Sequence, residues 1–172
     1  MCGIIGCVGY DDAKNVLIKG LKALEYRGYD SAGIAVLNNN KCEVTKCKGR
    51  VNALEEKVKS ITGSVGIGHT RWATHGKVSD SNSHPHKYGK VTLVHNGIIE
   101  NYNDLRKFLI DKGYTFYSQT DTEVIPNLIH YYYTSDTKND ALKVLRAVQK
   151  TCIDLKGSFA LQIISKFMPD NM

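Results

Sequence analysis

A short apolar segment punctuated by glycines opens the chain, and a helical repeat follows it directly. The segment Cys2–Gly9 contains only apolar side chains and three glycines. This composition suits a buried strand that lies close to its neighbours, because glycine lets another backbone approach. From Asp11 the apolar residues recur at helical spacing, which predicts an amphipathic helix over Asp11–Glu25. The change of period predicts a fold that mixes strands with helices.

The remaining segments alternate between strand and helix patterns in the same way. Predicted strands cover Gly33–Leu37, Cys42–Cys47, Val65–His69, Val91–Val94, Tyr114–Tyr117 and Phe159–Ser165. Predicted helices cover Val51–Ser60, a segment capped by Asn101 and ended by Gly113, a segment opened by the capping-box residues Thr120 and Glu123, and Ala141–Cys152. Strands in groups, with helices between and after them, are compatible with a four-layer αββα sandwich and with other mixed folds.

The composition limits the class of protein. The chain has 172 residues, of which 42% are hydrophobic and 23% charged, which is enough for one soluble domain with its own core. No apolar run approaches the roughly twenty residues of a membrane helix, so no membrane association is predicted. The five cysteines are an odd number without CxxC spacing, which favours a reducing cytoplasm over a disulfide framework or a structural zinc site.

The net charge of +6 makes nucleic acid the first partner to consider. The lysines are dispersed, however, and no basic helix carries interleaved aromatic residues. We therefore predict a lysine-rich surface and no nucleic-acid partner, although a positive field would favour an anionic substrate.

The longest polar segment is Thr70–Tyr88, and a loop of this length inside a domain is usually functional or disordered. Its His84-Pro85-His86 sequence raises the possibility of a metal site. Two histidines without a third ligand at a suitable spacing are weak evidence, and we predict no metal.

Cys2 would combine two reactive groups if Met1 is removed, as methionine aminopeptidase generally does before a small residue. The residue would then carry a thiol and a free α-amine, and an α-amine has a reference pKa of about 8. Such an amine can accept the thiol proton directly or through one water, so no histidine base is required. Taken alone, an incidental cysteine after the start codon is the simpler interpretation.

Five sequence blocks favour the catalytic interpretation. The opening at residues 1–6, MCGIIG, is similar to that of class II glutamine amidotransferases, which are N-terminal-nucleophile (Ntn) hydrolases. Four further blocks resemble signatures of the hexosamine-forming glutamine–fructose-6-phosphate aminotransferase family. They are LEYRGYDSAG at residues 24–33, HTRWATHG at 69–76, HNGIIEN at 95–101 and TDTE at 120–123. The blocks follow the family order over nearly the whole chain, so the resemblance is specific.

Attack of a thiolate on the side-chain amide of glutamine forms a tetrahedral oxyanion, which needs hydrogen-bond donors where the charge develops. The resemblance assigns this role to the side-chain amide of Asn96 and the backbone N–H of Gly97. Both are expected just after a buried strand, and Gly97 has no Cβ to block the approach of substrate. Asn-Gly is also the strongest short signal for a hairpin turn, which is the alternative interpretation.

Glutamine must also be held by its α-carboxylate and α-ammonium groups. Arg71 can form a bidentate pair with a carboxylate and Asp121 can hold an ammonium group, and the resemblance assigns these roles to them. It also implies polar contacts from Thr74 and His75, and a loop carrying Trp72 that closes over bound glutamine. The alternatives are a solvated Arg71, an Asp121 that only stabilises the first turn of a helix, and a Trp72 in the core or on the surface.

Arg27, Tyr29 and Asp30 form a dense polar cluster between two apolar elements. We expect them to support the Cys2 end of the site from behind the residues that contact substrate. An ordinary ion pair within a loop is the alternative.

The resemblance implies an Ntn-type αββα fold over residues 2–172, and hydrolysis of glutamine to glutamate and ammonia through a γ-glutamyl thioester on Cys2. In the family, ammonia passes to a sugar-isomerase half that makes glucosamine 6-phosphate from fructose 6-phosphate, and this sequence lacks that half. The parent enzyme is expected to be a cytoplasmic homodimer without a metal or organic cofactor. The alternatives are a glutaminase domain that serves another acceptor and an inactive assembly or binding fragment.

The C-terminal end carries a turn signal, Pro169-Asp170-Asn171, which normally introduces another element. We therefore expect the glutaminase domain to be truncated there. A naturally short protein with a frayed tail is the alternative.

Overall fold

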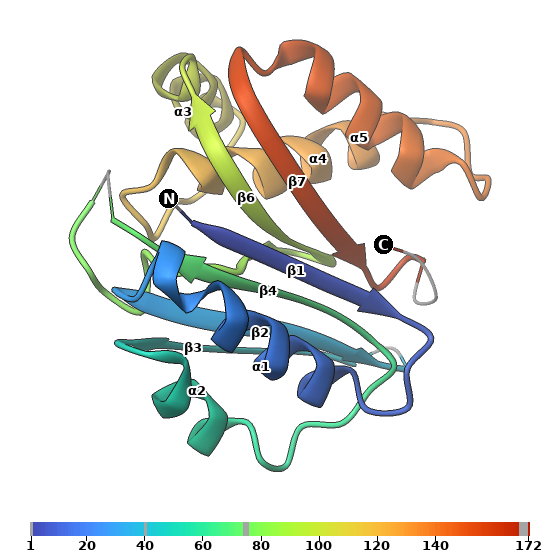
Figure 1. Cartoon of the computed structure of the whole chain (residues 1–172). Coiled ribbons are helices and arrows are strands. Elements are labelled where there is room, and N and C mark those ends of the chain that lie inside the picture. Colours follow the sequence, from blue (N-terminus) through green and yellow to red (C-terminus); the bar gives the residue numbers. More distant parts are fainter. Residues whose placement is uncertain (1, 40, 74–75, 169–171) are drawn as a thin grey trace.

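Two antiparallel sheets form the centre of the structure, and helices cover the outer face of each sheet (Figure 1). The computed structural model describes residues 2–39, 41–73, 76–168 and 172. The layers follow the order helix, sheet, sheet, helix, which confirms the predicted αββα sandwich.

The first sheet has the strand order β1-β4-β2-β3, and neighbouring strands run antiparallel. Its strands are β1 (Gly3–Val8), β2 (Ser31–Asn38), β3 (Lys41–Lys48) and β4 (Val65–Arg71). Its outer face is covered by α1 (Ala13–Leu24), which continues into the short 3-10 helix η1 (Glu25–Arg27), and by α2 (Val51–Lys57). The helix α1 begins where the Asp12 carboxylate accepts the Asn15 N–H at 3.2 Å, as an N-cap residue does.

The second sheet has the order β5-β6-β7 and is also antiparallel. Its strands are β5 (His86–Tyr88), β6 (Val91–Ile99) and β7 (Gly157–Ser165). The helices on its side of the molecule are α3 (Tyr102–Asp111), the short 3-10 helix η2 (Asp121–Glu123), α4 (Val124–Ser135) and α5 (Lys143–Asp154). In the part of the chain that the structure describes, no helix has the length and apolar character needed to cross a membrane.

Strand alternation divides the apolar side chains between three cores. In β2, Ile34 and Val36 pack beneath α1 and α2, whereas Ala35 and Leu37 pack in the core between the two sheets. A third core lies between the second sheet and the helices α3, α4 and α5, and it includes Leu93 of β6. Each sheet therefore has two buried faces, which is what a four-layer fold requires.

The predicted strand over Tyr114–Tyr117 is wrong, because this segment is irregular and its end is held by a carboxylate. Glu123 accepts hydrogen bonds from Tyr117 N at 2.9 Å and from Ser118 N at 2.7 Å. The predicted capping box is wrong for the same reason. Glu123 uses its oxygens on these donors, and the Thr120 side chain makes no cap to the helix.

Asn101 precedes α3 as predicted, but its side chain does not cap that helix. Its amide instead donates to Asp154 O at 2.8 Å and accepts from Lys156 N at 2.9 Å. The side chain therefore ties the start of α3 to the connection between α5 and β7. The other predicted elements are present with displaced ends, and β6 is much longer than the predicted Val91–Val94.

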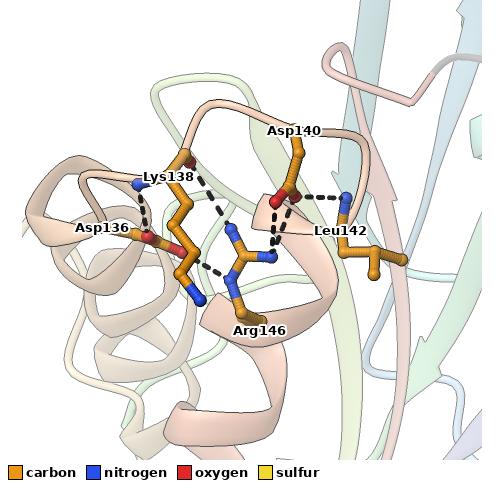
Figure 2. A network of polar contacts seen from close by, with 5 residues as sticks. All are labelled: Asp136, Lys138, Asp140, Leu142 and Arg146. Atoms are coloured by element: carbon orange, nitrogen blue, oxygen red, sulfur yellow. Dashed lines mark hydrogen bonds and ion pairs between the residues drawn. The ribbon is translucent and has the colours of Figure 1, made fainter.

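A polar network around Arg146 closes the connection between α4 and α5 (Figure 2). The Arg146 guanidinium pairs with Asp136 at 2.7 Å and with Asp140 at 2.8 Å. The same carboxylates accept backbone N–H groups, from Lys138 and Leu142 respectively, each at 2.9 Å. One arginine on α5 therefore fixes the loop before it at two points.

Candidate active site

The start of β1, the end of β4, the strand β6 and η2 meet around one small cavity. Its volume is about 40 Å³. The cavity is lined by Cys2, Arg71, Trp72, His84, His95, Asn96, Gly97, Thr120, Asp121 and Thr122. Six of the residues predicted for catalysis or glutamine binding are therefore brought together, although they come from distant parts of the sequence.

Cys2 lies immediately before β1 and is held by two neighbouring segments. Its Sγ accepts the Trp72 N–H at 3.3 Å and lies 3.7 Å from Trp72 O. Its carbonyl oxygen accepts from Asn96 Nδ2 at 2.9 Å. The pairing of β1 with β4, which sets Gly3 opposite Thr70, brings Cys2 to the end of β4. The thiol therefore lies on the wall of the cavity next to the predicted oxyanion donor.

Arg71 is the last residue of β4, and strand alternation directs it toward the second sheet. Val65 and Ile67 of the same strand pack in the inter-sheet core, so every second residue of β4 faces that way. Arg71 is only 5% exposed. Burial lowers the pKa of its guanidinium, while negative charge on Cys2, Asp30 and Asp121 opposes the shift. The guanidinium stays charged at neutral pH, because an arginine does not lose its proton in proteins.

Asn96 and Gly97 lie inside β6, so the turn interpretation of Asn-Gly is wrong. They pair with Ala160 and Phe159 of β7. Alternation along β6 places Asn96 on the face of Val94, toward the first sheet and Cys2.

The position of Gly97 in β6 gives a second reason for a glycine there. Its φ of +136° belongs to the region that favours glycine. A Cβ on Gly97 would lie 2.1 Å from Ser158 O of β7, so the clash is with the neighbouring strand. Because Gly97 has no side chain, β6 and β7 can remain paired at this position.

Asp121 begins η2 and is fixed to the end of β6. Its Oδ2 accepts the Ile99 N–H at 2.8 Å, and its Oδ1 lies 3.5 Å from Thr122 Oγ1. The carboxylate therefore lines the cavity from the side opposite the start of β1, while one of its oxygens is used by the backbone.

The loop that follows η1 packs directly against the end of β4. Asp30 Oδ2 accepts the Ala73 N–H at 2.7 Å, and Asp30 N donates to Arg71 O at 3.1 Å. A Cβ on Gly28 would lie 2.8 Å from the Arg71 carbonyl carbon and 2.9 Å from Trp72 N. The loop is thus in contact with the peptide unit whose N–H donates to the Cys2 thiol.

The other two members of the predicted supporting cluster lie at the edge of the site. Tyr29 stacks edge-on against Trp72, with ring centroids 5.2 Å apart. Trp72 is 43% exposed and lines the cavity, so it is not a core residue. Arg27 lines a second hollow of about 410 Å³, which shares Cys2 and Asn96 with the first. Cys2 is therefore flanked by two hollows.

The predicted glutamine contacts Thr74 and His75 lie outside the described residues.

Sequence reasoning assigned no part in glutamine binding or catalysis to His84, His95, Thr120 or Thr122, which also line the cavity. The available signal was the position of His95 at the end of an apolar run, because a polar side chain buried in a strand must find a partner. His95 Nδ1 lies 2.9 Å from Thr122 Oγ1. Each of these four residues is at most 5% exposed.

Four buried histidines gather beside the cavity. The rings of His69 and His84 stack with centroids 4.0 Å apart, and His86 lies edge-on to His84 at 4.8 Å. Burial is the largest cause that lowers the pKa of each, to about 3 for His69 and well below the usual value for His84 and His86. Burial also lowers the pKa of His95, against the opposing charge of Asp121. These rings are therefore neutral near pH 7.

His84 and His86 do not form a metal site with other residues that the structure describes. Across residues 2–39, 41–73, 76–168 and 172, no group of three or more His, Cys, Asp or Glu side chains is arranged to hold a metal ion. The two rings contact threonine hydroxyls instead, at Thr122 and Thr120.

Proteins of known family are similar to this chain in sequence and in fold. The family model described as "Glutamine amidotransferase domain" matches residues 69–168. The glutamine–fructose-6-phosphate aminotransferase [isomerizing] of Clostridium acetobutylicum is 53% identical over 176 residues, which cover 100% of this chain and 28% of the relative. The enzyme of that name from Haemophilus influenzae is 47% identical, with the same coverage. This chain thus spans about 28% of the length of these curated relatives.

The fold is also that of a solved amidotransferase. The glutamine phosphoribosylpyrophosphate amidotransferase from B. subtilis, complexed with ADP and GMP, superposes with a TM-score of 0.81 at 25% identity. The match covers 96% of this chain and 35% of that one. The resemblance inferred from the five sequence blocks is confirmed, and the chain belongs to the glutamine amidotransferase domain family.

Proposed function

We propose that this chain is the glutaminase domain of an enzyme that transfers the amide nitrogen of glutamine to fructose 6-phosphate. One observation carries the proposal. The Cys2 thiol shares a single cavity with two candidate oxyanion donors, Asn96 and Gly97, and with two oppositely charged side chains, Arg71 and Asp121. Hydrolysis of glutamine needs a nucleophile, an oxyanion site, and two charged groups that bind the α-carboxylate and the α-ammonium of the substrate.

In the proposed reaction, removal of Met1 frees the α-amine of Cys2, which takes the thiol proton. The thiolate attacks the side-chain amide carbon of glutamine, and the proton passes to the departing nitrogen. Ammonia leaves, a γ-glutamyl thioester remains on Cys2, and water then hydrolyses it to glutamate. The Trp72 N–H, 3.3 Å from Sγ, is a donor that can stabilise the thiolate before attack.

The direction of the Gly97 N–H supports its role as an oxyanion donor. The N–H and C=O of His95 both contact histidine rings on the side of β6 away from β7. Alternation along an extended strand then turns the Asn96 C=O toward β7 and the Gly97 N–H away from it. The Ile99 N–H points to that same side, where it donates to Asp121. The Gly97 N–H therefore faces the cavity side of the strand.

Recognition of the amino-acid end of glutamine falls to Arg71 and Asp121. Arg71 is buried and positive, so a substrate carboxylate would meet a partly desolvated guanidinium, which strengthens the pair. Asp121 keeps one oxygen on the Ile99 N–H and would offer the other to the ammonium. Thr74 and His75 are part of the proposal on the resemblance alone.

Glutamine is too large for the cavity as it stands. A water molecule needs about 10–15 Å³ on the same measure, so a cavity of about 40 Å³ has room for only a few waters. We propose that the segment beginning at Trp72 moves outward to admit glutamine and then closes over it. The 43% exposure of Trp72 is compatible with that movement.

The acceptor half of the reaction rests on the curated relatives, which are much longer than this chain. Their printed name specifies fructose 6-phosphate and isomerisation. We propose that ammonia made at Cys2 passes to a sugar-isomerase domain of a homodimeric parent enzyme, which forms glucosamine 6-phosphate. The five cysteines are all free, which supports a cytoplasmic location.

The test is release of glutamate and ammonia from glutamine by the purified chain. Cys2→Ala should abolish release, whereas Cys152→Ala should leave the rate unchanged, because Cys152 lies on α5. Substantial turnover by Cys2→Ala would disprove the nucleophile assignment. A chain that binds glutamine, measured by calorimetry, without turning it over would favour an inactive binding fragment. In a third outcome, the chain turns over glutamine while a sugar-isomerase domain supplied in trans fails to transfer the ammonia to fructose 6-phosphate. That result would favour another acceptor.

A further inference from the structure

The strand β6 loses a neighbour just before the proposed oxyanion donors. On one edge it pairs with β5, but only as far as Leu93 opposite His86. Beyond that point, histidine rings take the place of a partner strand. His84 Nδ1 accepts the His95 N–H at 3.3 Å, and His69 Nε2 lies 3.1 Å from His95 O. The peptide groups on both sides of the His95 Cα are therefore held by side chains from outside the sheet.

Donor and acceptor chemistry fixes the protons of these two rings. A backbone N–H can only donate, so His84 Nδ1 carries a lone pair and the proton of its neutral ring is on Nε2. A carbonyl oxygen can only accept, so His69 Nε2 carries the proton of the second ring. His69 is 1% exposed and His84 5% exposed, and both are held neutral by burial.

The Thr122 hydroxyl is the point at which this arrangement meets the opposite wall of the site. Its Oγ1 lies 3.4 Å from His84 Nε2, 2.9 Å from His95 Nδ1 and 3.5 Å from Asp121 Oδ1. His84 donates to Oγ1, because its Nε2 carries the proton. The contact of Oγ1 with His95 Nδ1, at 2.9 Å, is within the normal range for a hydrogen bond, whereas the contact in which Oγ1 donates to Asp121 Oδ1, at 3.5 Å, is longer. Thr122 thus connects both histidines with one group.

We propose that Thr122 is a positioning residue that holds the strand carrying Asn96 and Gly97 at a fixed distance from Asp121. This inference rests on the proposed function, because it gives that site a further residue. Thr122 follows Asp121 directly in sequence, and it bonds the residue directly before Asn96. The hydroxyl therefore couples the donors that meet the oxyanion to the segment that holds the substrate ammonium.

The geometry predicts which kinetic constant depends on Thr122. Asp121 has a second anchor in the Ile99 N–H at 2.8 Å, so it keeps its place when the Thr122 hydroxyl is lost. The His95 side chain is only 3% exposed. Without the Thr122 hydroxyl, its Nδ1 would be buried without its partner. Loss of the hydroxyl should therefore disturb the oxyanion donors more than the binding of glutamine.

The experiment compares Thr122→Val, which keeps the shape and removes the hydroxyl, with Thr122→Ser, which keeps the hydroxyl. Glutaminase kcat is expressed per active site, counted as the fraction of Cys2 that reacts with the glutamine-mimicking diazoketone 6-diazo-5-oxonorleucine. Thr122→Val should lower kcat about 10- to 100-fold, because misplacement costs less than loss of a donor, with KM within about 3-fold of the original. Thr122→Ser should restore kcat to within about 3-fold.

The matched control is Thr151→Val, which removes another fully buried threonine hydroxyl, one that donates to Ala147 O on α5. It should lower the melting temperature and leave kcat per active site unchanged. If Thr122→Val gives no soluble protein, Thr122→Ala removes the same hydroxyl without adding bulk and carries the same expectation. A normal kcat per active site in a Thr122 variant without the hydroxyl would overturn the inference. Failure of the unaltered chain to turn over glutamine would overturn the proposed function itself.

Discussion

The buried histidines predict that this domain loses stability in mild acid. His69, His84 and His86 are each at most 5% exposed. Burial lowers the pKa of His69 to about 3 and those of His84 and His86 well below the usual value. In the unfolded chain a histidine has a pKa of about 6.5. Between the two values the unfolded chain binds more protons than the folded one, so the free energy of unfolding falls as the pH falls.

The size of this loss follows from the difference between the two states. At pH 5 the solution is about 1.5 pH units below the pKa of an unfolded histidine, whereas the folded His69 ring, with a pKa of about 3, is still neutral. Each unit corresponds to about 1.4 kcal/mol, so His69, with a folded pKa of about 3, costs about 2 kcal/mol at pH 5. His84 and His86, whose pKa values burial lowers well below the usual value, add to this loss in the same direction. A small domain is stable by only about 5–15 kcal/mol, so the loss is a large part of the total.

The assay is urea unfolding, followed by circular dichroism, at pH 7.5 and at pH 5. The free energy of unfolding should fall by at least about 2 kcal/mol between the two, the share of His69 alone, and most of the loss should occur below about pH 6.5. His86→Gln keeps a group that can bond Thr120, and it should make the fall smaller, because a glutamine does not titrate. Equal stability at both pH values would refute the reasoning, because it would mean that the folded protein protonates these rings without cost.

Three further predictions concern the proposed site and the loop before α5. Asn96→Ala should lower kcat for glutamine hydrolysis by roughly 100- to 1,000-fold with little change in KM, measured by steady-state glutamate release; an effect confined to KM would contradict an oxyanion role. Arg71→Lys should mainly raise KM, because an ammonium cannot form the bidentate pair with a carboxylate, and an unchanged KM would argue against carboxylate recognition. Hydrogen bonds from Arg146 are the largest cause that lowers the pKa of Asp136 and of Asp140. Both carboxylates therefore stabilise the fold when the pH is above their unfolded pKa. They lose that contribution as the pH falls through the lowered pKa values. Arg146→Ala should lower the melting temperature at pH 7 and weaken its dependence on pH below about 4, and an unchanged melting curve would show that the network adds no stability.

The layers of the fold could be predicted from the sequence because they depend on local periodicity. The helical spacing over Asp11–Glu25 appears as α1, and the alternation in Gly33–Leu37 appears as β2, which packs on both faces. The end of β6 could not be predicted in this way. Asn96-Gly97 has the composition of a turn, but pairing with β7, more than fifty residues later, keeps the strand extended to Ile99. Local signals do not contain the contacts that decided this case.

The same limit applies to the site. Cys2, Arg71, Asn96 and Asp121 could be selected because they lie in the blocks that resemble the family and because the proposed hydrolysis has a use for each side chain. Thr122 could not, since a threonine at the start of a helix has an ordinary local role. Its importance arises from the ring nitrogens of His95, on β6, and His84, in the loop before β5, which lie within 3.4 Å of its hydroxyl oxygen. Positioning groups are therefore visible only once the strands are assembled.

The central claim is that Cys2 forms a covalent γ-glutamyl thioester with glutamine. The most direct test mixes the protein with glutamine, stops the reaction in acid within milliseconds to seconds, and maps the adduct by peptide mass spectrometry. We predict an N-terminal peptide that begins at Cys2, lacks Met1 and gains the mass of one glutamyl group, and we predict that Asn96→Ala slows its appearance. No adduct during turnover, or an adduct on Cys7, Cys42, Cys47 or Cys152 in place of Cys2, would contradict the account.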